Sequence, residues 1–143
     1  MNTTAGSYSL LDSIVPQEAG VVTRLKQAGA ILLGHSHSPI SFSSAHDKTG
    51  TANMAEWAHF RSNFANGWSG RGGQATSAYY PGGESWGSST GSAIAASIGL
   101  TAVALGTETN GSISGPAAYN NVIGIKPTVG LTSRAGGMHR SNI

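Results

Sequence analysis

The sequence contains no cysteine and few charged residues. The absence of Cys from all 143 residues excludes disulfides, thiolate catalysis and Cys-ligated zinc or iron–sulfur sites. Only 10% of the residues are charged and the net charge is +2, which excludes charge-rich disorder. The few basic residues are scattered, which argues against nucleic-acid binding. The length suits one ordinary folded domain.

Long hydrophobic runs are also missing. The longest apolar stretch, residues 93–105, is too short and too interrupted to span a bilayer, which needs about 20 residues. Residues 1–10 are polar and lack the basic segment and apolar core of a signal peptide. The sequence therefore predicts no membrane span. It leaves the compartment unknown, with the cytoplasm as the default expectation.

Glycine and serine are abundant, since together they make up 41 of the 143 residues. They do not form a flexible linker, because apolar blocks separate the Gly/Ser clusters. Apolar periodicity predicts a helix over 19–29 that ends at Gly29, and small residues predict a helix over 92–99. The helix followed by an apolar run indicates an α/β fold. Two apolar runs, 30–33 and 101–107, predict buried strands. Residues 122–125 are a further short strand candidate.

Residues 35–50 differ from the rest of the chain. They show neither helical nor strand periodicity and consist of residue types that favour turns or disorder. The stretch contains three histidines, but no ordered scaffold holds them, so no metal site is predicted. We expect 35–50 to be a disordered insertion. A second helix is expected to begin near Asn53, where Glu56 completes a capping box.

Two Ser/Gly clusters could support chemistry: residues 87–92 and residues 109–112. A Gly-rich loop or a helix N-terminus presents free N–H groups to a developing oxyanion. A serine among such donors is a candidate nucleophile. Either cluster alone is equally compatible with an ordinary turn. Neither has the spacing of a phosphate-binding or dinucleotide-binding loop, and the nucleophile-elbow motif is absent.

Taken together and in order, these clusters and the segments around them resemble the amidase signature family, including fungal amidase-like members and the amidase-like chain of glutamyl-tRNA amidotransferase. The similarity runs from about Thr3 to Ala135. It implies that residues 1–143 form a partial amidase domain, an α/β fold with a mixed central sheet flanked by helices. It also implies hydrolysis of the amide C–N bond of a small-molecule substrate, with no cofactor and no metal. The matching segments are Gly87–Ala93, Ala104–Ile113, Pro116–Ala117 and Gly124–Gly130.

The resemblance assigns a Ser–cis-Ser–Lys triad. It makes Ser112 the nucleophile and Ser88 the bridging serine, 24 positions apart. An alcohol needs a base to become nucleophilic. A second hydroxyl can relay the proton because it both donates and accepts. The oxyanion hole implied by the family consists of the N–H groups of Thr109, Asn110, Gly111 and Ser112.

The family's lysine lies upstream of the segment that Thr3 begins, and this sequence starts at Met1. Lys26, Lys48 and Lys126 do not match its position, and Lys126 is expected to be structural. Three interpretations therefore stay open: an amide hydrolase, a catalytically inactive amidase fragment, and a non-hydrolytic amidotransferase-like subunit. The chain by itself is expected to hydrolyse no amide. Glu108 is expected to order its loop by accepting hydrogen bonds.

Overall fold

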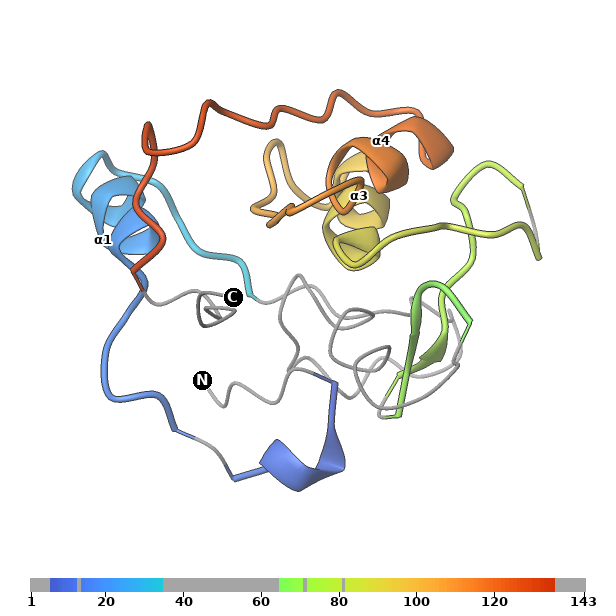
Figure 1. Cartoon of the computed structure of the whole chain (residues 1–143), viewed down its shortest axis with the longest axis horizontal. Coiled ribbons are helices and arrows are strands. Elements are labelled where there is room, and N and C mark those ends of the chain that lie inside the picture. The colour runs from blue at the N-terminus through green and yellow to red at the C-terminus, as the bar shows by residue number, and fades with distance from the viewer. Residues whose placement is uncertain (1–5, 13, 35–64, 71, 81, 136–143) are drawn as a thin grey trace. The chain divides into compact units, whose positions relative to one another are not determined.

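The computed structural model describes most of the chain in two units (Figure 1). One unit joins the residues up to Ile14 to residues 34–126, and the other joins residues 15–33 to those from Pro127 onward. Within the described residues, no helix is long and apolar enough to cross a membrane. The described residues are 6–12, 14–34, 65–70, 72–80 and 82–135.

The smaller unit contains helix α1, Gly20–Gln27, as the apolar periodicity predicts. Its first N–H group, that of Gly20, donates to the carbonyl oxygen of Ala135 at 3.2 Å. The helix ends where Gly29 takes a φ of +87°. This left-handed turn lets the N–H of Ala30 reach back to the carbonyl of Leu25 at 2.9 Å, which satisfies one of the last helical carbonyls.

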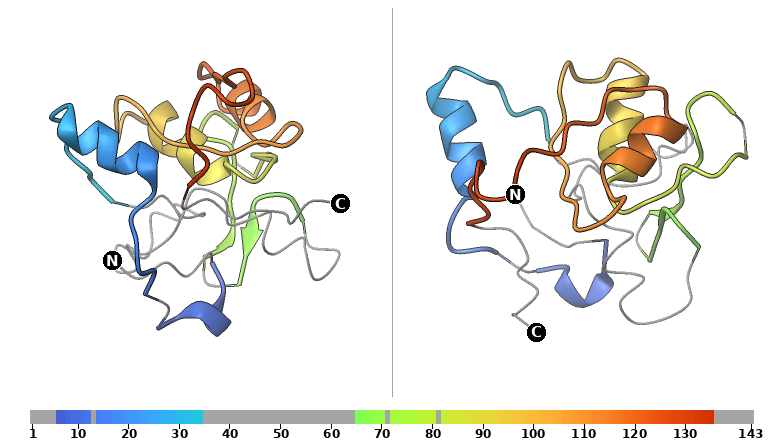
Figure 2. Two further views of the ribbon diagram at one scale, coloured as in Figure 1. Left: turned by 60° about the vertical axis from the view of Figure 1, so that its left-hand side comes forward. Right: turned by 45° about the horizontal axis from the view of Figure 1, so that its top comes forward.

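The larger unit is built around two short helices, α3 at Thr90–Ser97 and α4 at Ser114–Tyr119. They pack against each other in every view (Figure 2). Helix α3 confirms the predicted small-residue helix, although it begins two residues earlier. It ends as α1 does, with Gly99 at a φ of +75°. The sequence did not predict α4.

The larger unit also contains a small antiparallel hairpin. Strand β1, Trp68–Ser69, pairs with β2, Gly73–Gln74, in a register that places Trp68 opposite Gln74. The hydroxyl of Ser69 accepts the N–H of Gly72 at 3.0 Å and closes the turn. An isolated bridge between Thr76 and Glu84 continues the pairing. This unit also contains a 3₁₀ turn, η1 at Tyr8–Leu10.

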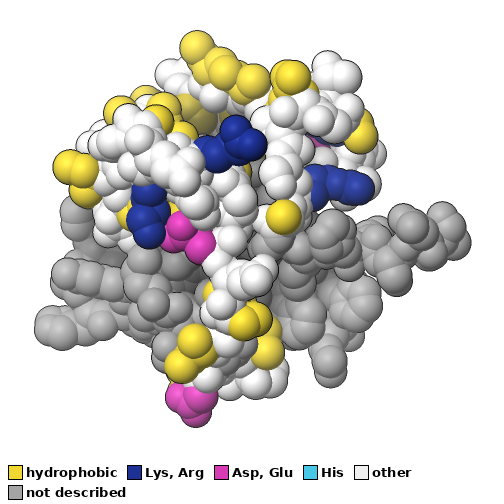
Figure 3. Space-filling view, turned by 90° about the vertical axis from the view of Figure 1, so that its left-hand side faces the viewer, with side chains coloured by type: hydrophobic (Ala, Val, Ile, Leu, Met, Phe, Trp, Pro, Cys, Tyr) yellow, Lys and Arg dark blue, Asp and Glu magenta, His cyan; other side chains and the backbone are white. Residues whose placement is uncertain are grey.

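The three predicted strands do not form in the described residues, so these predictions were wrong. Residues 30–33, 101–107 and 122–125 are all irregular. A buried strand needs a hydrogen-bonded neighbouring strand and cover on both faces, and no strand pairs with these runs in the described part of the chain. Ile31 is 84% exposed, Val103 77% and Ile123 91%. Figure 3 shows such hydrophobic side chains at the surface.

Two further predictions lie outside the described residues. These are the disordered insertion over 35–50 and the helix that begins near Asn53.

The interior of the larger unit is small and polar. Its buried apolar residues are alanines, one isoleucine and Pro116, while its buried polar residues are mostly serines. The serine hydroxyls donate to main-chain carbonyls. The Ser77 hydroxyl donates to the carbonyl of Tyr119 at 3.0 Å, and the Ser92 hydroxyl donates to the carbonyl of Leu105 at 2.5 Å. Hydrogen bonding therefore holds this unit together to an unusual degree. The many serines of the sequence supply these hydroxyl groups.

Asn120 is the centre of this polar interior and is fully buried. Its side-chain oxygen accepts the N–H of Ala78 at 3.2 Å. Its amide nitrogen donates to the carbonyls of Ser85 at 3.2 Å and Pro116 at 2.9 Å. Its own carbonyl accepts the hydroxyl of Ser97 at 2.7 Å. One residue thus joins α3, α4 and the loop that precedes the first Ser/Gly cluster.

We predict that Asn120→Ala lowers the free energy of unfolding by about 1–3 kcal/mol, because it leaves buried main-chain groups without partners. Urea unfolding of the full chain measures the change. Asn121→Gly is the matched control, because Asn121 is exposed and its φ of 55° suits glycine. The prediction fails if Asn120→Ala costs no more stability than the control.

Candidate functional site

Ser89 joins the two Ser/Gly clusters. Its N–H donates to the carbonyl oxygen of Ser112 at 3.1 Å. Its hydroxyl donates to the carbonyl of Thr107 and accepts the N–H of the same residue, both at 3.2 Å. A Cβ on Gly106 would lie only 2.9 Å from the Ser89 hydroxyl, so this contact requires glycine. The start of α3 therefore lies directly against the loop that contains Ser112.

Ser88 precedes this junction and is only 6% exposed. Within the described residues, its hydroxyl is the sole buried side-chain polar atom that has no hydrogen-bond partner. Leaving a buried hydroxyl unpaired costs about 1–3 kcal/mol. Such a group marks a position where the structure needs a further donor or acceptor. Ser88 is therefore the one buried serine of the described residues whose hydroxyl is not bonded to the surrounding main chain.

The loop of residues 109–112 leads from Glu108 directly into α4. Ser112 is half-buried, and Gly111 takes a φ of +80°. Among the described residues, nothing accepts a hydrogen bond from the N–H groups of Thr109, Asn110 or Ser112. The Ser112 hydroxyl likewise has no partner there. The predicted nucleophile thus lies beside main-chain donors that are free to bind an anion.

The Glu108 carboxylate bonds to residues just after the loop and to Lys126. One carboxylate oxygen accepts the N–H groups of Ile113 at 2.7 Å and Ser114 at 2.8 Å, and the Ser114 hydroxyl at 3.1 Å. The other oxygen lies 3.3 Å from Nζ of Lys126. Lys126 also donates to the carbonyl of Thr109 at 2.8 Å. The contacts agree with the expected loop-ordering role of Glu108 and structural role of Lys126.

The same contacts shift the ionisation of Glu108, whose side chain is 6% exposed. Burial by itself raises the pKa of this carboxyl. The main-chain N–H groups of Ser114, Ile113 and Gly111, together with the Ser114 hydroxyl, outweigh burial and lower the pKa to about 2. Hydrogen bonds to the charged form favour that form. Glu108 is therefore an anion that holds the loop, not a general acid.

Neither described lysine is placed to serve as the base of a triad. The ammonium of Lys126 is engaged by Glu108 and by the Thr109 carbonyl. Lys26 belongs to the other unit, where it pairs with Glu18 at 3.0 Å on the surface. Lys48 lies outside the described residues.

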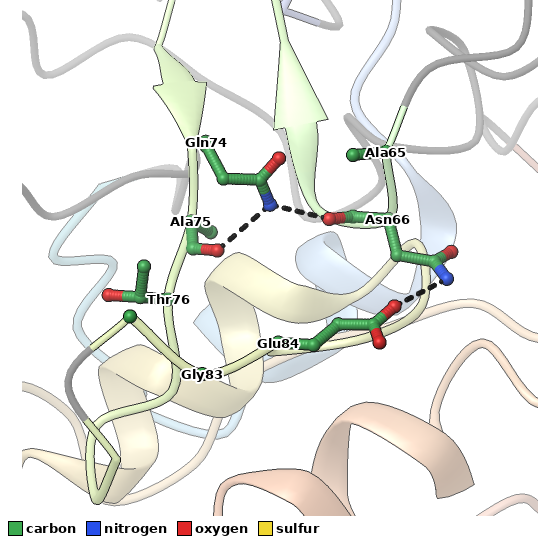
Figure 4. A pocket seen from close by; sticks show the side chains of 8 residues that line it. Ala65, Asn66, Gln74, Ala75, Thr76, Gly83 and Glu84 are labelled. Atoms are coloured by element: carbon green, nitrogen blue, oxygen red, sulfur yellow. Dashed lines mark hydrogen bonds between the residues drawn. The ribbon is translucent and has the colours of Figure 1, made fainter.

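A pocket of about 220 Å³ lies beside the hairpin (Figure 4). The amide nitrogen of Asn66 donates to Glu84 at 2.7 Å, and that of Gln74 donates to the Asn66 carbonyl at 2.6 Å. The polar groups of the lining therefore largely form hydrogen bonds with one another. The lining includes neither Ser88 nor any residue of the 109–112 loop. We therefore place the candidate site at the joined serine clusters, not in this pocket.

The low pKa of Glu108 predicts that acid lowers the folding stability of the chain. Because folding lowers the pKa of this carboxyl from 4.5 to about 2, its contribution to stability is complete above pH 4.5 and is lost as the pH falls toward 2. We predict that Glu108→Gln costs about 1.5–3 kcal/mol of unfolding free energy near neutral pH. The cost should shrink as the pH approaches 2.

Denaturant unfolding of the full chain between pH 2 and pH 7 measures this effect. The control is Glu18→Gln, since Glu18 is a surface carboxylate of the other unit. A cost for Glu108→Gln that stays constant across this pH range would contradict the account.

Comparison with known proteins connects this geometry to a family. The amidase family model matches residues 1–143. A probable amidase of Arabidopsis thaliana is 50% identical over 137 residues, which cover 95% of this chain and 24% of that protein. A putative amidase of Schizosaccharomyces pombe is also 50% identical over 137 residues, covering 95% of this chain and 21% of that protein. The chain thus spans about a quarter of the length of these relatives.

A solved structure gives the same result. The native peptide amidase of Stenotrophomonas maltophilia matches with a TM-score of 0.74 and 45% sequence identity, over 93% of this chain and 24% of that one. The described helices and hairpin therefore form part of an amidase-signature α/β fold, as the sequence predicts. The match of the family model to the whole sequence and the structural match lead to one conclusion: the chain belongs to the amidase family.

Proposed function

We propose that this chain contributes the nucleophile loop of an amidase that hydrolyses amide C–N bonds by acyl transfer to Ser112. The observation that carries the proposal is the contact between the two serine clusters. Ser88 is buried with an unpaired hydroxyl, and the next residue bonds the Ser112 main chain. Membership of the amidase family supports amide hydrolysis in general.

In the proposed reaction, Oγ of Ser112 attacks the carbonyl carbon of the amide, and its proton passes through the Ser88 hydroxyl to a base. The C–N bond then breaks, and ammonia or an amine leaves with a proton returned by the base. Water attacks the resulting ester and releases the acid and free Ser112.

The oxyanion of the tetrahedral intermediate is proposed to bind the N–H groups of residues 109–112. Support comes from Thr109, Asn110 and Ser112, whose N–H groups have no acceptor in the described part of the chain. The Glu108 carboxylate holds one end of the loop and Lys126 holds the other at the Thr109 carbonyl, so these donors need not reorganise during the reaction. Preorganised donors of this kind are worth several kcal/mol to a transition state, about 2.7–4 for one donor.

The base is proposed to be the lysine that the family resemblance places upstream of Thr3. The unpaired Ser88 hydroxyl offers the site for such a lysine to bind. A lysine in that position would accept the proton once burial and neighbouring groups lower its pKa.

Labelling with a fluorophosphonate, which reacts with activated serines, tests the assignment directly. We predict that the folded full chain is modified at Ser112, as identified by peptide mass spectrometry, and that a small amine added as a substitute base accelerates the reaction. Ser88→Ala should slow labelling by about 100-fold or more, the contribution usual for a proton-transfer group.

Ser114→Ala is the matched control for Ser112→Ala. Ser114 is exposed and lies two residues after Ser112, at the start of α4, where its hydroxyl binds Glu108. Labelling should persist in Ser114→Ala and disappear in Ser112→Ala. Modification of another serine, or labelling no faster than in the urea-unfolded chain, would overturn the proposal.

A further inference from the structure

Trp86 occupies a backbone conformation that bulky residues rarely adopt. Its φ is +50°, and the following Gly87 is also left-handed at +74°. A left-handed φ at a bulky residue is a genuine outlier, and such strain persists only where the surroundings over-determine it. The Thr90 hydroxyl supplies part of that restraint, since it donates to the carbonyls of Trp86 and Gly87 at 2.5 and 2.7 Å.

The ring of Trp86 lies directly against the segment that carries Ser112. A Cβ built on Gly115 would overlap Cε3 and Cζ3 of the ring, and a Cβ on Gly111 would lie 2.7 Å from Cη2. Both glycines are therefore required by contact with the same indole. They stand on either side of Ser112, one residue before it and three residues after it.

A second aromatic residue supports the ring. Tyr119, the last residue of α4, stacks on Trp86 with a centroid distance of 6.1 Å and an interplanar angle of 13°. Offset stacking of this kind adds to the stabilisation that burial of the rings provides. The indole thus contacts both the loop before α4 and the end of that helix.

We infer that Trp86 is a positioning residue for the proposed hydrolysis. Its ring fixes the main chain from Gly111 to Gly115 and so holds the Ser112 hydroxyl and the neighbouring N–H donors in place. The strained backbone at Trp86 is retained because it turns the indole toward these glycines. This inference rests on the proposed function.

Substitutions of Trp86 can separate the role of its ring from the strain of its left-handed backbone. Trp86→Gly removes the ring but suits the left-handed backbone better than tryptophan does. If the ring had no role, this substitution would leave the loop unchanged or make the chain more stable. Trp86→Phe keeps a smaller ring at the cost of the same strain. Trp68→Ala is the control, because Trp68 is another half-buried tryptophan and lies in the hairpin.

Hydrogen exchange followed by mass spectrometry on the full chain is the primary measurement. We predict that Trp86→Gly speeds amide exchange over residues 109–115 by ~10-fold, while exchange within α3 changes little. Trp86→Phe should restore most of the protection, and Trp68→Ala should leave residues 109–115 unaffected. Unchanged exchange over 109–115 in Trp86→Gly, or an equal rise in α3, would overturn the inference.

Fluorophosphonate labelling of the same variants links the ring to the chemistry. The labelling rate of Ser112 should fall in Trp86→Gly and recover in Trp86→Phe. An unchanged rate in Trp86→Gly would contradict the positioning role. If Ser112 of the unmodified chain is not labelled, the proposed function fails. Hydrogen exchange still tests whether the ring holds the loop in that case, because it requires no reaction at Ser112.

Discussion

The candidate site depends on the hydrogen bonds that Ser89 makes to the loop opposite. Its N–H binds the Ser112 carbonyl, and its hydroxyl binds both main-chain groups of Thr107. These bonds hold the start of α3, directly after Ser88, against the loop that contains Ser112. The absence of a side chain at Gly106 lets the two segments approach this closely.

Around this junction, the larger unit uses polar groups where most domains use bulky hydrophobic residues. Asn120 and the buried serines fix main-chain carbonyls, and Glu108 fixes main-chain N–H groups. Hydrogen bonds are directional, so they define the course of a loop more closely than apolar contact does. Ser88 is the exception among the described residues, since its buried hydroxyl is unpaired. An exception of this kind is expected at a reactive centre, where a polar group is kept available.

The sequence predicted the elements whose causes are local. Helices α1 and α3 follow from residue spacing and from the glycines that end them. The roles expected for Glu108 and Lys126 agree with their contacts. The predicted strands failed because a strand depends on partners that the run itself does not encode, as the exposure of Val103 and Ile123 shows.

Helix α4 was missed for a related reason. Its sequence, Ser-Gly-Pro-Ala-Ala-Tyr, has little intrinsic helix preference. The N–H groups at its start are satisfied by Glu108, and its end packs on Trp86. The left-handed backbone of Trp86 could not be predicted from the sequence either, because a positive φ is ordinarily expected at glycine. These features arise from tertiary contacts, which spacing and composition do not reveal.

The central claim is that the two serine clusters form one reaction site. A crystal structure of the Ser112 phosphonate adduct tests it most directly. The account predicts that a phosphonate oxygen accepts the N–H groups of Thr109, Asn110 and Ser112, with the Ser88 hydroxyl hydrogen-bonded to Oγ of Ser112. An adduct whose oxygens face solvent, with the Ser88 hydroxyl bonded elsewhere, would contradict it.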